Sequence, residues 1–145
     1  MWDVELTTDV PETPVRALAD RDEIGQLFRN LIDNAIKYGG KGSTVEIALK
    51  VDVLDGAEVA KISVRDHGPG IEREHLPRLT ERFYRINVKH SRETGGTGLG
   101  LAICKHIANR HRGRLEVRSQ LGEGSQFTLI IPTIVEDALV DSGDT

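Results

Sequence analysis

Two apolar segments separated by Asp55-Gly56 restrict the possible folds of this chain more than any other feature of its sequence. Apolar and polar residues alternate from Thr44 to Leu54, as in a half-buried strand, and a second apolar run follows from Val59 to Val64. Asp-Gly between two such runs is typical of an antiparallel hairpin. A hairpin excludes an all-parallel, doubly wound sheet. One face of the first strand is expected to carry Val45, Ile47, Leu49, Val51 and Val53.

The flanking segments have helical spacing. Apolar residues recur every three or four positions from Asp20 to Lys37, and Gly39-Gly40 is expected to end that helix. The same spacing returns from Thr97 to His111, where the helix should stop at Gly113. A weaker helical pattern, interrupted by Pro77, runs from Glu72 to Phe83.

Three further strands are expected: an edge strand with Val4 and Leu6, and the segments Leu115–Val117 and Phe127–Ile131 about a turn at 122–124. Together these elements predict an α/β two-layer sandwich. Its sheet is expected to be mixed, largely antiparallel, with about five strands, and to be covered on one face by about three helices.

Length and composition exclude several classes of protein. The 145 residues fit one domain, expected over residues 1–133, followed by an acidic, frayed tail over 134–145. The single cysteine, Cys104, excludes an internal disulfide and favours a cytoplasmic, reducing compartment. A formal net charge of -4 argues against a nucleic-acid partner. No apolar run approaches the roughly 20 residues of a membrane span, so no direct membrane contact is expected.

The first candidate site lies on the helix from Asp20 to Lys37. Asn30, Asn34 and Lys37 are spaced four and then three residues apart, which places them on one polar stripe. Carboxamide oxygens can ligate Mg²⁺, and a lysine one turn further can neutralise phosphate oxygens. The alternative is that the stripe is only the solvated face of an amphipathic helix.

The second candidate follows a strand directly, in Asp66-His67-Gly68-Pro69-Gly70-Ile71. An aspartate at a strand end can accept a hydrogen bond from an exocyclic amine, and the two glycines would let the backbone pass close to a flat ring. The alternative is a tight turn in which the aspartate caps its own backbone.

The third candidate is the segment Gly95-Gly96-Thr97-Gly98-Leu99-Gly100, which opens a helix. Successive N–H groups at a helix N-terminus form an anion site. The spacing matches neither the lysine-bearing P-loop nor the dinucleotide fingerprint. A phosphate site of another kind is therefore favoured.

These three segments, with Glu81-Arg82-Phe83-Tyr84-Arg85 between the second and the third, resemble the ATP-binding catalytic domain of sensor histidine kinases. That family belongs to the ATPase superfamily of a heat-shock chaperone, type II topoisomerases and mismatch-repair ATPases. The resemblance covers the chain from about Val4 to Pro132. It implies a Bergerat-type fold with a flexible ATP lid, and ATP and Mg²⁺ as cofactors.

The resemblance also implies roles for single residues. Asn34 resembles the Mg²⁺ ligand and Asn30 the other asparagine of that box, while Lys37 resembles the lysine that reaches the phosphates. Asn30 and Lys37 would thus support catalysis. Tyr38 resembles the aromatic residue that packs on the adenine, and Asp66 the carboxylate that receives the adenine amino group.

The remaining implied nucleotide contacts come from glycine-rich segments. The first segment shapes the adenine wall and contains Gly68, Gly70 and Ile71. The second grips the phosphates and contains Gly96, Thr97, Gly98, Leu99 and Gly100. The third is a weaker glycine box with Gly124, Ser125 and Phe127. Two departures concern local geometry: His67 stands where the family often has asparagine, and Gly39-Gly40 where Ser/Thr-Pro often follows the helix.

The implied function is transfer of the ATP γ-phosphoryl group to a histidine on a separate dimerisation domain in two-component signalling, with a response regulator as indirect partner. None of the five histidines has the context of a phosphoacceptor, so the acceptor is expected outside this chain, and the isolated domain is expected to be a monomer. Two alternatives remain: a protein serine kinase of the anti-sigma-factor type, and a nucleotide-binding module without transfer activity. An ATPase clamp is disfavoured because Asn30 stands where such proteins carry a carboxylate base.

Overall fold

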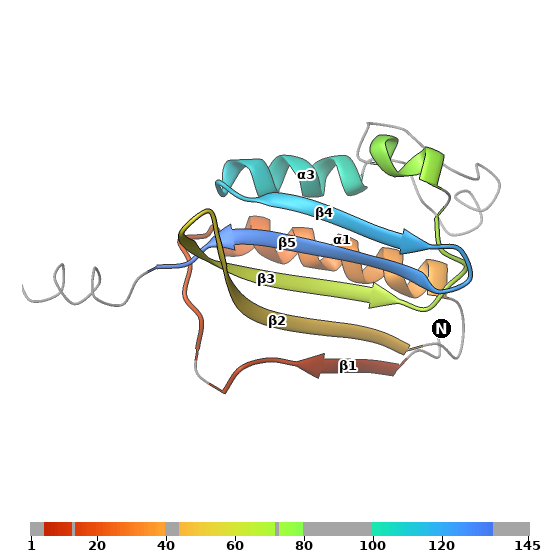
Figure 1. The fold of residues 1–145 in the computed structure, drawn as a ribbon, viewed down its shortest axis with the longest axis horizontal. Coiled ribbons are helices and arrows are strands. Elements are labelled where there is room, and N and C mark those ends of the chain that lie inside the picture. Colours follow the sequence, from red (N-terminus) through yellow and green to blue (C-terminus); the bar gives the residue numbers. More distant parts are fainter. Residues whose placement is uncertain (1–4, 13, 40–43, 72, 80–99, 135–145) are drawn as a thin grey trace, which may run out of the picture.

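The computed structural model describes residues 5–12, 14–39, 44–71, 73–79 and 100–134. Its centre is a five-stranded sheet in the order β1-β2-β3-β5-β4 (Figure 1). The strands are β1 (Glu5–Asp9), β2 (Thr44–Leu54), β3 (Ala57–Asp66), β4 (Arg114–Gln120) and β5 (Gly124–Pro132). Among these strands β1 pairs in parallel with β2, and the other neighbours are antiparallel. The predicted mixed, largely antiparallel sheet is confirmed.

The predicted hairpin joins β2 to β3 with its turn at Asp55-Gly56. Both residues have positive φ angles, 51° and 80°. Two successive positive φ angles characterise the tight turn that matches the twist of a hairpin, and Asp-Gly suits it because glycine adopts them without steric cost. Local turn chemistry therefore sets the register in which Leu54 faces Ala57.

The helices cover one face of this sheet. The α-helix α1 (Arg21–Gly39) packs against β2, β3 and β5, and α3 (Gly100–Arg110) packs against β4, β5 and α1 (Figure 1). The short 3-10 helix η1 (Arg73–Arg78) lies against β4. The core between the layers includes Leu27, Leu31, Val45, Val64, Cys104, Phe127 and Leu129. The predicted two-layer sandwich is thus confirmed.

Cys104 is completely buried in this core, as its apolar neighbours in the sequence indicate. Burial raises the pKa of its thiol to about 12, so the side chain stays protonated near neutral pH. Its Sγ lies 3.5 Å from the carbonyl oxygen of Leu27 on α1. Cys104 therefore acts as a small packing residue between the two α-helices.

Several expectations differ from the structure in extent. The strands β3, β4 and β5 are longer than the apolar runs that predict them, because cross-strand hydrogen bonds continue into polar residues. The alternation places Val51 and Val53 on the same buried face as Val45, but they are 45% and 62% exposed. They lie in the half of β2 nearest the hairpin turn, where its residues are mainly exposed.

Of the segment from Glu72 to Phe83, which was expected to be helical, the structure describes residues 73–79. A 3-10 helix spans Arg73–Arg78 with Pro77 inside it. Proline has no N–H and cannot extend an α-helical ladder, which accounts for the tighter, shorter element. Residues 72 and 80–83 of that segment, the start of the helix expected at Thr97, and the tail after Ile134 lie outside the described residues. Among the described residues, no helix is both long and apolar enough to cross a bilayer.

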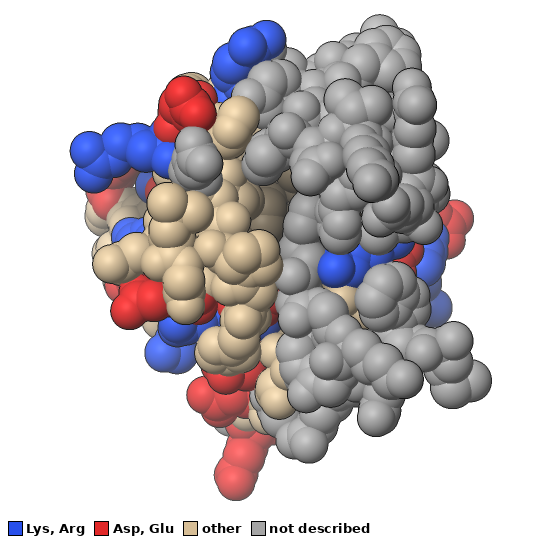
Figure 2. Space-filling view, turned by 90° about the vertical axis from the view of Figure 1, so that its right-hand side faces the viewer, with Lys and Arg blue, Asp and Glu red and all other residues tan. Residues whose placement is uncertain are grey.

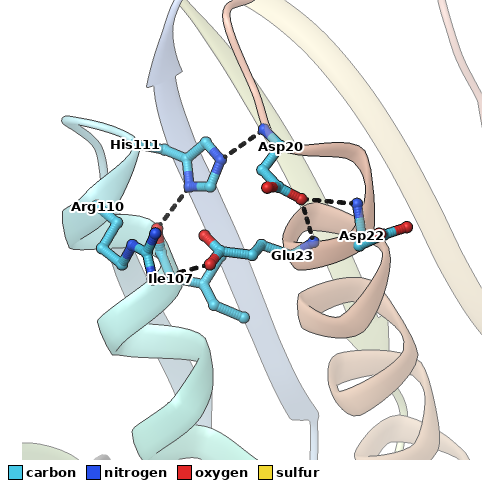
Figure 3. Close-up of polar contacts among 6 residues, drawn as sticks. All are labelled: Asp20, Asp22, Glu23, Ile107, Arg110 and His111. Carbon is cyan, nitrogen blue, oxygen red and sulfur yellow. Dashed lines mark hydrogen bonds and ion pairs between the residues drawn. The ribbon is translucent and has the colours of Figure 1, made fainter.

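A polar cluster ties the start of α1 to the end of α3 (Figure 3). The carboxylate of Asp20 accepts hydrogen bonds from the N–H groups of Asp22 and Glu23 at 2.9 and 3.0 Å, which is an N-cap. The ring of His111 accepts the N–H of Asp20 at 3.0 Å and donates to the carbonyl of Ile107 at 2.7 Å. These contacts fix the angle between the two helices.

Gly25 on α1 offers a test of the helix itself. Among the described atoms, an added Cβ there would meet the guanidinium of Arg29 at 3.2 Å, and the far end of that side chain can move. We expect Gly25→Ala to raise the free energy of unfolding by about 0.5–1 kcal/mol, because alanine has the higher helix propensity. Urea unfolding followed by circular dichroism measures this. A destabilised variant would show that the position needs glycine for packing.

Candidate functional site

The described parts of the three segments singled out in the sequence lie at one end of the molecule. The second half of α1, the final residue of β3 and the first described residue of α3 all lie at the right-hand end of Figure 1. The side-chain Nδ2 of Asn30 is 3.5 Å from the carbonyl oxygen of Gly100, so α1 and α3 meet there. Seen from that side, the described surface beside the grey atoms carries a patch of uncharged residues (Figure 2).

The stripe on α1 sits at the margin of the core. Asn30, Asn34 and Lys37 are half-buried, whereas Gln26 and Asp33 on the same helix are exposed. The adjacent face of α1 is anchored by the fully buried Leu27 and Leu31, which sets the rotation of the helix. The stripe is therefore not simply the solvated face of the helix.

Asp66 closes β3 with a buried carboxylate. Its residue is 2% exposed, and Oδ1 accepts the N–H of Gly68 at 2.9 Å. Burial raises the pKa of this carboxyl above 3.8, an effect only partly offset by the N–H groups of Gly68 and Ser125 and by electrostatic interaction with His67 and Arg65. A carboxylate that is buried despite this cost is typical of functional sites.

The turn after Asp66 is shaped by a neighbouring hairpin. Gly70 has a φ of 80°, and a Cβ there would lie 2.3 Å from the carbonyl oxygen of Gln120. The N–H of Gly122 donates to the carbonyl of Pro69 at 2.8 Å. Asp66 caps its own turn through the N–H of Gly68, as the alternative interpretation expects, and a contact of Asp66 with adenine stays a prediction. The requirement for glycine at 70 comes from contact with the β4–β5 turn and not only from space for a ligand.

Ser119 contacts three other residues at this end of the molecule through its hydroxyl, and no sequence pattern identified it in advance. Its Oγ accepts the N–H of Ile71 at 2.7 Å and lies 2.9 Å from both the carbonyl oxygen of Gly124 and the Oγ of Ser125. Ser119 and Ser125 face each other across the β4–β5 hairpin. Two serines placed symmetrically about the glycine turn were the available sequence signal for this pair.

His67, one of the two departures from the resembled family, lies at the surface. Its Nε2 is 2.7 Å from Oε1 of Glu46 on β2, and both side chains are nearly half exposed. The imidazole therefore points to the neighbouring strand β2. The other departure is partly described: α1 does end at Gly39, and Gly40 lies outside the described residues.

The other predicted site residues are placed as follows. Gly68 and Ile71 are half-buried in the turn, and Gly100 begins the described part of α3. Phe127 is a core residue on β5 that pairs with Val64 and Val117, so its packing role is evident while a nucleotide contact stays a prediction. The side chain of Tyr38 and the residues Gly96, Thr97, Gly98 and Leu99 lie outside what the structure describes.

Comparison with known proteins adds independent observations. Residues 19–134 match the family model described as histidine kinase-, DNA gyrase B-, and HSP90-like ATPase. The chain is 43% identical over 134 residues to the sensor-like histidine kinase SenX3 of Mycobacterium tuberculosis, covering 92% of this chain and 32% of SenX3. It is 48% identical over 106 residues to the phosphate regulon sensor protein PhoR of Pseudomonas aeruginosa, covering 73% of this chain and 23% of PhoR.

A solved structure agrees with the fold. The mycobacterial sensor histidine kinase MprB superposes with a TM-score of 0.75 at 30% identity, covering 90% of this chain and 83% of that one. The matched sequence relatives are longer, since the chain spans about a third of SenX3 and less than a quarter of PhoR.

Proposed function

The chain belongs to the family of histidine kinase-, DNA gyrase B- and HSP90-like ATPases, and we propose that it is the ATP-binding catalytic domain of a sensor histidine kinase. In this proposal it transfers the γ-phosphoryl group of ATP to a histidine on a separate dimerisation domain. The observation that carries the proposal is the buried Asp66 carboxylate at the same end of the sandwich as the Asn30, Asn34 and Lys37 stripe. The Asp66 carboxylate suits an adenine amine, and the side chains of the stripe suit a metal-bound polyphosphate.

The proposed chemistry is mainly positioning and charge neutralisation. Asp66 accepts a hydrogen bond from the adenine amino group, with Gly68, Gly70 and Ile71 forming the wall beside it. Lys37 neutralises phosphate oxygens, and Asn30 holds the start of α3 through Gly100. The γ-phosphoryl group is transferred from ATP to the nucleophile, with ADP as the leaving group, and the protein needs to form few or no covalent bonds itself. The nucleophile and any base that orients it come from the partner domain.

Mg²⁺ fits the donor set at this end. Asn34 offers a half-buried carboxamide oxygen one turn from Asn30 and near Lys37. Within the described ranges, no three His, Cys, Asp or Glu side chains form a metal-binding group. Mg²⁺ is commonly held by one or two protein ligands together with substrate phosphates, so a single amide is compatible with it. When bound, the ion supplies positive charge to the β- and γ-phosphates.

The proposed partners follow from the relatives. Sensor kinases such as SenX3 and PhoR are several times longer than this chain, and a dimerisation domain with the phosphoacceptor histidine is the partner we infer. A response regulator would receive the phosphoryl group from that domain. We also infer a cytoplasmic location, and a monomer when the domain is isolated. The relatives favour this function over a serine kinase of the anti-sigma-factor type.

A labelling experiment tests the proposed function. The chain is incubated with γ-labelled ATP, Mg²⁺ and a purified dimerisation domain that carries its phosphoacceptor histidine, and the labelled protein is then treated with acid. We expect label on the dimerisation domain that acid removes, as phosphohistidine behaves. Acid-stable label would indicate the serine-kinase alternative. ATP binding without label would indicate a binding module. A His→Ala variant of the acceptor is the control.

Asn34→Asp tests the metal assignment. We expect the dependence of ATP affinity on Mg²⁺ to change by about tenfold or more, because a carboxylate alters the charge at the ion. Fluorescence competition with and without Mg²⁺ measures this. Gln26→Glu is the matched control, since it introduces the same charge on the exposed face of α1. Equal Mg²⁺ dependence in wild type and Asn34→Asp would exclude Asn34 as the ligand.

A further inference from the structure

We propose that Ser119 is a positioning residue for the nucleotide-binding turn, because its hydroxyl fastens that turn to the β4–β5 hairpin. The inference rests on the proposed ATP site at Asp66–Ile71 and adds a residue 48 positions away from the end of that turn. Ser119 is not expected to touch the nucleotide. It acts by holding Asp66 and Ile71 at a fixed separation and orientation.

The hydrogen bonds around Ser119 can be assigned completely. A serine hydroxyl has one proton and can accept up to two hydrogen bonds. The N–H of Ile71 can only donate, at 2.7 Å, and the carbonyl of Gly124 can only accept, at 2.9 Å. The remaining contact, 2.9 Å to the Oγ of Ser125, is then one in which Ser125 donates. The hydroxyl of Ser119 is therefore fully used by three partners.

These contacts reach both ends of the turn. Ile71 at one end is held directly through its N–H. Asp66 at the other end is the cross-strand neighbour of Ser125, and the backbone N–H of Ser125 stabilises the Asp66 carboxylate. The middle of the turn is held where the N–H of Gly122 donates to the carbonyl of Pro69. The hydroxyl of Ser119 thus links Ile71 to Ser125, and through Ser125 to Asp66.

Register explains why Ser119 is in a position to do this. Val117, Phe127 and Val64 are neighbours across β4, β5 and β3, and they pack in the core. Ser119, Ser125 and Asp66 are the next neighbours on the same face, since alternate residues of a strand share a face. A hydrophobic row therefore gives way to a polar row just where the turn begins. The polar row is placed to hold the turn and not to extend the apolar core.

The chemistry of the position restricts what can replace serine. Alanine would leave the half-buried N–H of Ile71 and the carbonyl of Gly124 without this partner, which is costly for buried polar groups. Threonine keeps the hydroxyl and is well suited to a strand. Cysteine keeps the volume but forms only weak hydrogen bonds. Comparing these three substitutions distinguishes the effect of losing the hydrogen bonds from the effect of losing side-chain volume.

The test measures affinity for ATP and GTP, by competition with a fluorescent nucleotide, in Ser119→Ala, Ser119→Cys and Ser119→Thr. We expect Ser119→Ala to weaken ATP binding about tenfold, the equivalent of one lost hydrogen bond, and to reduce the preference for ATP over GTP. Ser119→Cys, which fills the space that alanine leaves and keeps a weak donor and acceptor, is expected to show a smaller loss of the same kind. Ser119→Thr should restore most of the affinity.

Two further measurements separate positioning from general stability. In an Asp66→Ala background, Ser119→Ala should weaken ATP affinity by no more than a further factor of about two, because the nucleotide contact that Ser119 positions is already lost. Ser63→Ala, which removes a half-buried hydroxyl from β3 on the opposite face of the sheet, should leave ATP affinity unchanged. Hydrogen exchange of the Ile71 amide should accelerate in Ser119→Ala without any nucleotide present.

The outcomes distinguish this inference from the proposed function. A wild-type chain that binds no ATP overturns the proposed function. A wild-type chain that binds ATP, with equal affinity in Ser119→Ala or Ser119→Cys, overturns the positioning role. The same loss in the Asp66→Ala background as in wild type also overturns it, because that additivity indicates only an effect on the fold.

Discussion

Asp66→Asn is expected to remove most of the preference for adenine over guanine, a loss of about 1–3 kcal/mol in the difference between the binding free energies of ATP and GTP. The carboxylate can only accept hydrogen bonds, and adenine offers an amino donor where guanine offers a carbonyl acceptor. Asparagine can turn its amide to serve either base. We expect a large effect because Asp66 is buried, and an unsatisfied polar group is costly in a buried position.

The same substitution should stabilise the nucleotide-free protein near neutral pH. The pKa of Asp66 is raised in the folded state, so folding favours the protonated carboxyl. Folded and unfolded chains are then equally protonated well below pH 3.8, and the wild type loses stability as the pH rises through the raised pKa. Asparagine does not ionise and escapes this loss. We expect a gain of about 0.5–2 kcal/mol, as for other residues kept for function.

Competition binding with ATP and GTP, and urea unfolding at acidic and neutral pH, test both parts. Unchanged discrimination in Asp66→Asn would exclude the adenine contact. A variant less stable than wild type at neutral pH but not at acidic pH would show that the ionised carboxylate stabilises the fold, contrary to our expectation.

Gly124→Ala is expected to destabilise the fold strongly, because two backbone segments meet at this glycine. Gly124 has a φ of 102°, and an added Cβ would lie 2.1 Å from the carbonyl oxygen of Asp66 and 2.9 Å from the Cα of His67. Both atoms belong to backbone, so the strand or the turn must move. We expect a loss of about 3 kcal/mol or more in the free energy of unfolding, together with weaker ATP binding.

Gly122→Ala is a matched control within the same hairpin turn. Its φ is 82°, but none of the described atoms lies within 4 Å of the added Cβ, so only the backbone conformation is strained. We expect a loss of about 1–2 kcal/mol for this variant. Thermal and urea unfolding compare the two. Equal losses would mean that the close approach to Asp66 does not matter, and that only the positive φ angles require glycine.

Much of the fold could be predicted from local patterns. The apolar spacing on α1 and the alternation on β2 identified these elements, and Asp55-Gly56 identified the turn between β2 and β3. The predictions were weaker where tertiary contacts override local preference. Val53 follows the alternation of a buried strand but is 62% exposed, since β2 is mainly exposed in the half nearest the turn. The ends of β4 and β5 extend beyond their apolar residues because the hydrogen-bonded ladder continues.

The candidate site was predictable in part. The residue types at Asn34 and Asp66 indicate metal and amine binding, and family membership supports both as proposals. Ser119 could not be recognised, because a lone serine near the end of a strand has no distinctive pattern. The position of Gly70 was recognised, but its close contact with Gln120 was not.

By itself, then, the sequence determined the two-layer architecture, the antiparallel hairpins and the family, because helical periodicity, turn chemistry and motif spacing are properties of neighbouring residues. Only the tertiary structure decided how the nucleotide-binding turn is held. Ser119, Ser125 and Asp66 come together through the register of three strands, and Gly124 is required by a backbone that comes from residues almost 60 positions earlier. Such contacts depend on distances across the sheet, to which no local pattern in the chain corresponds.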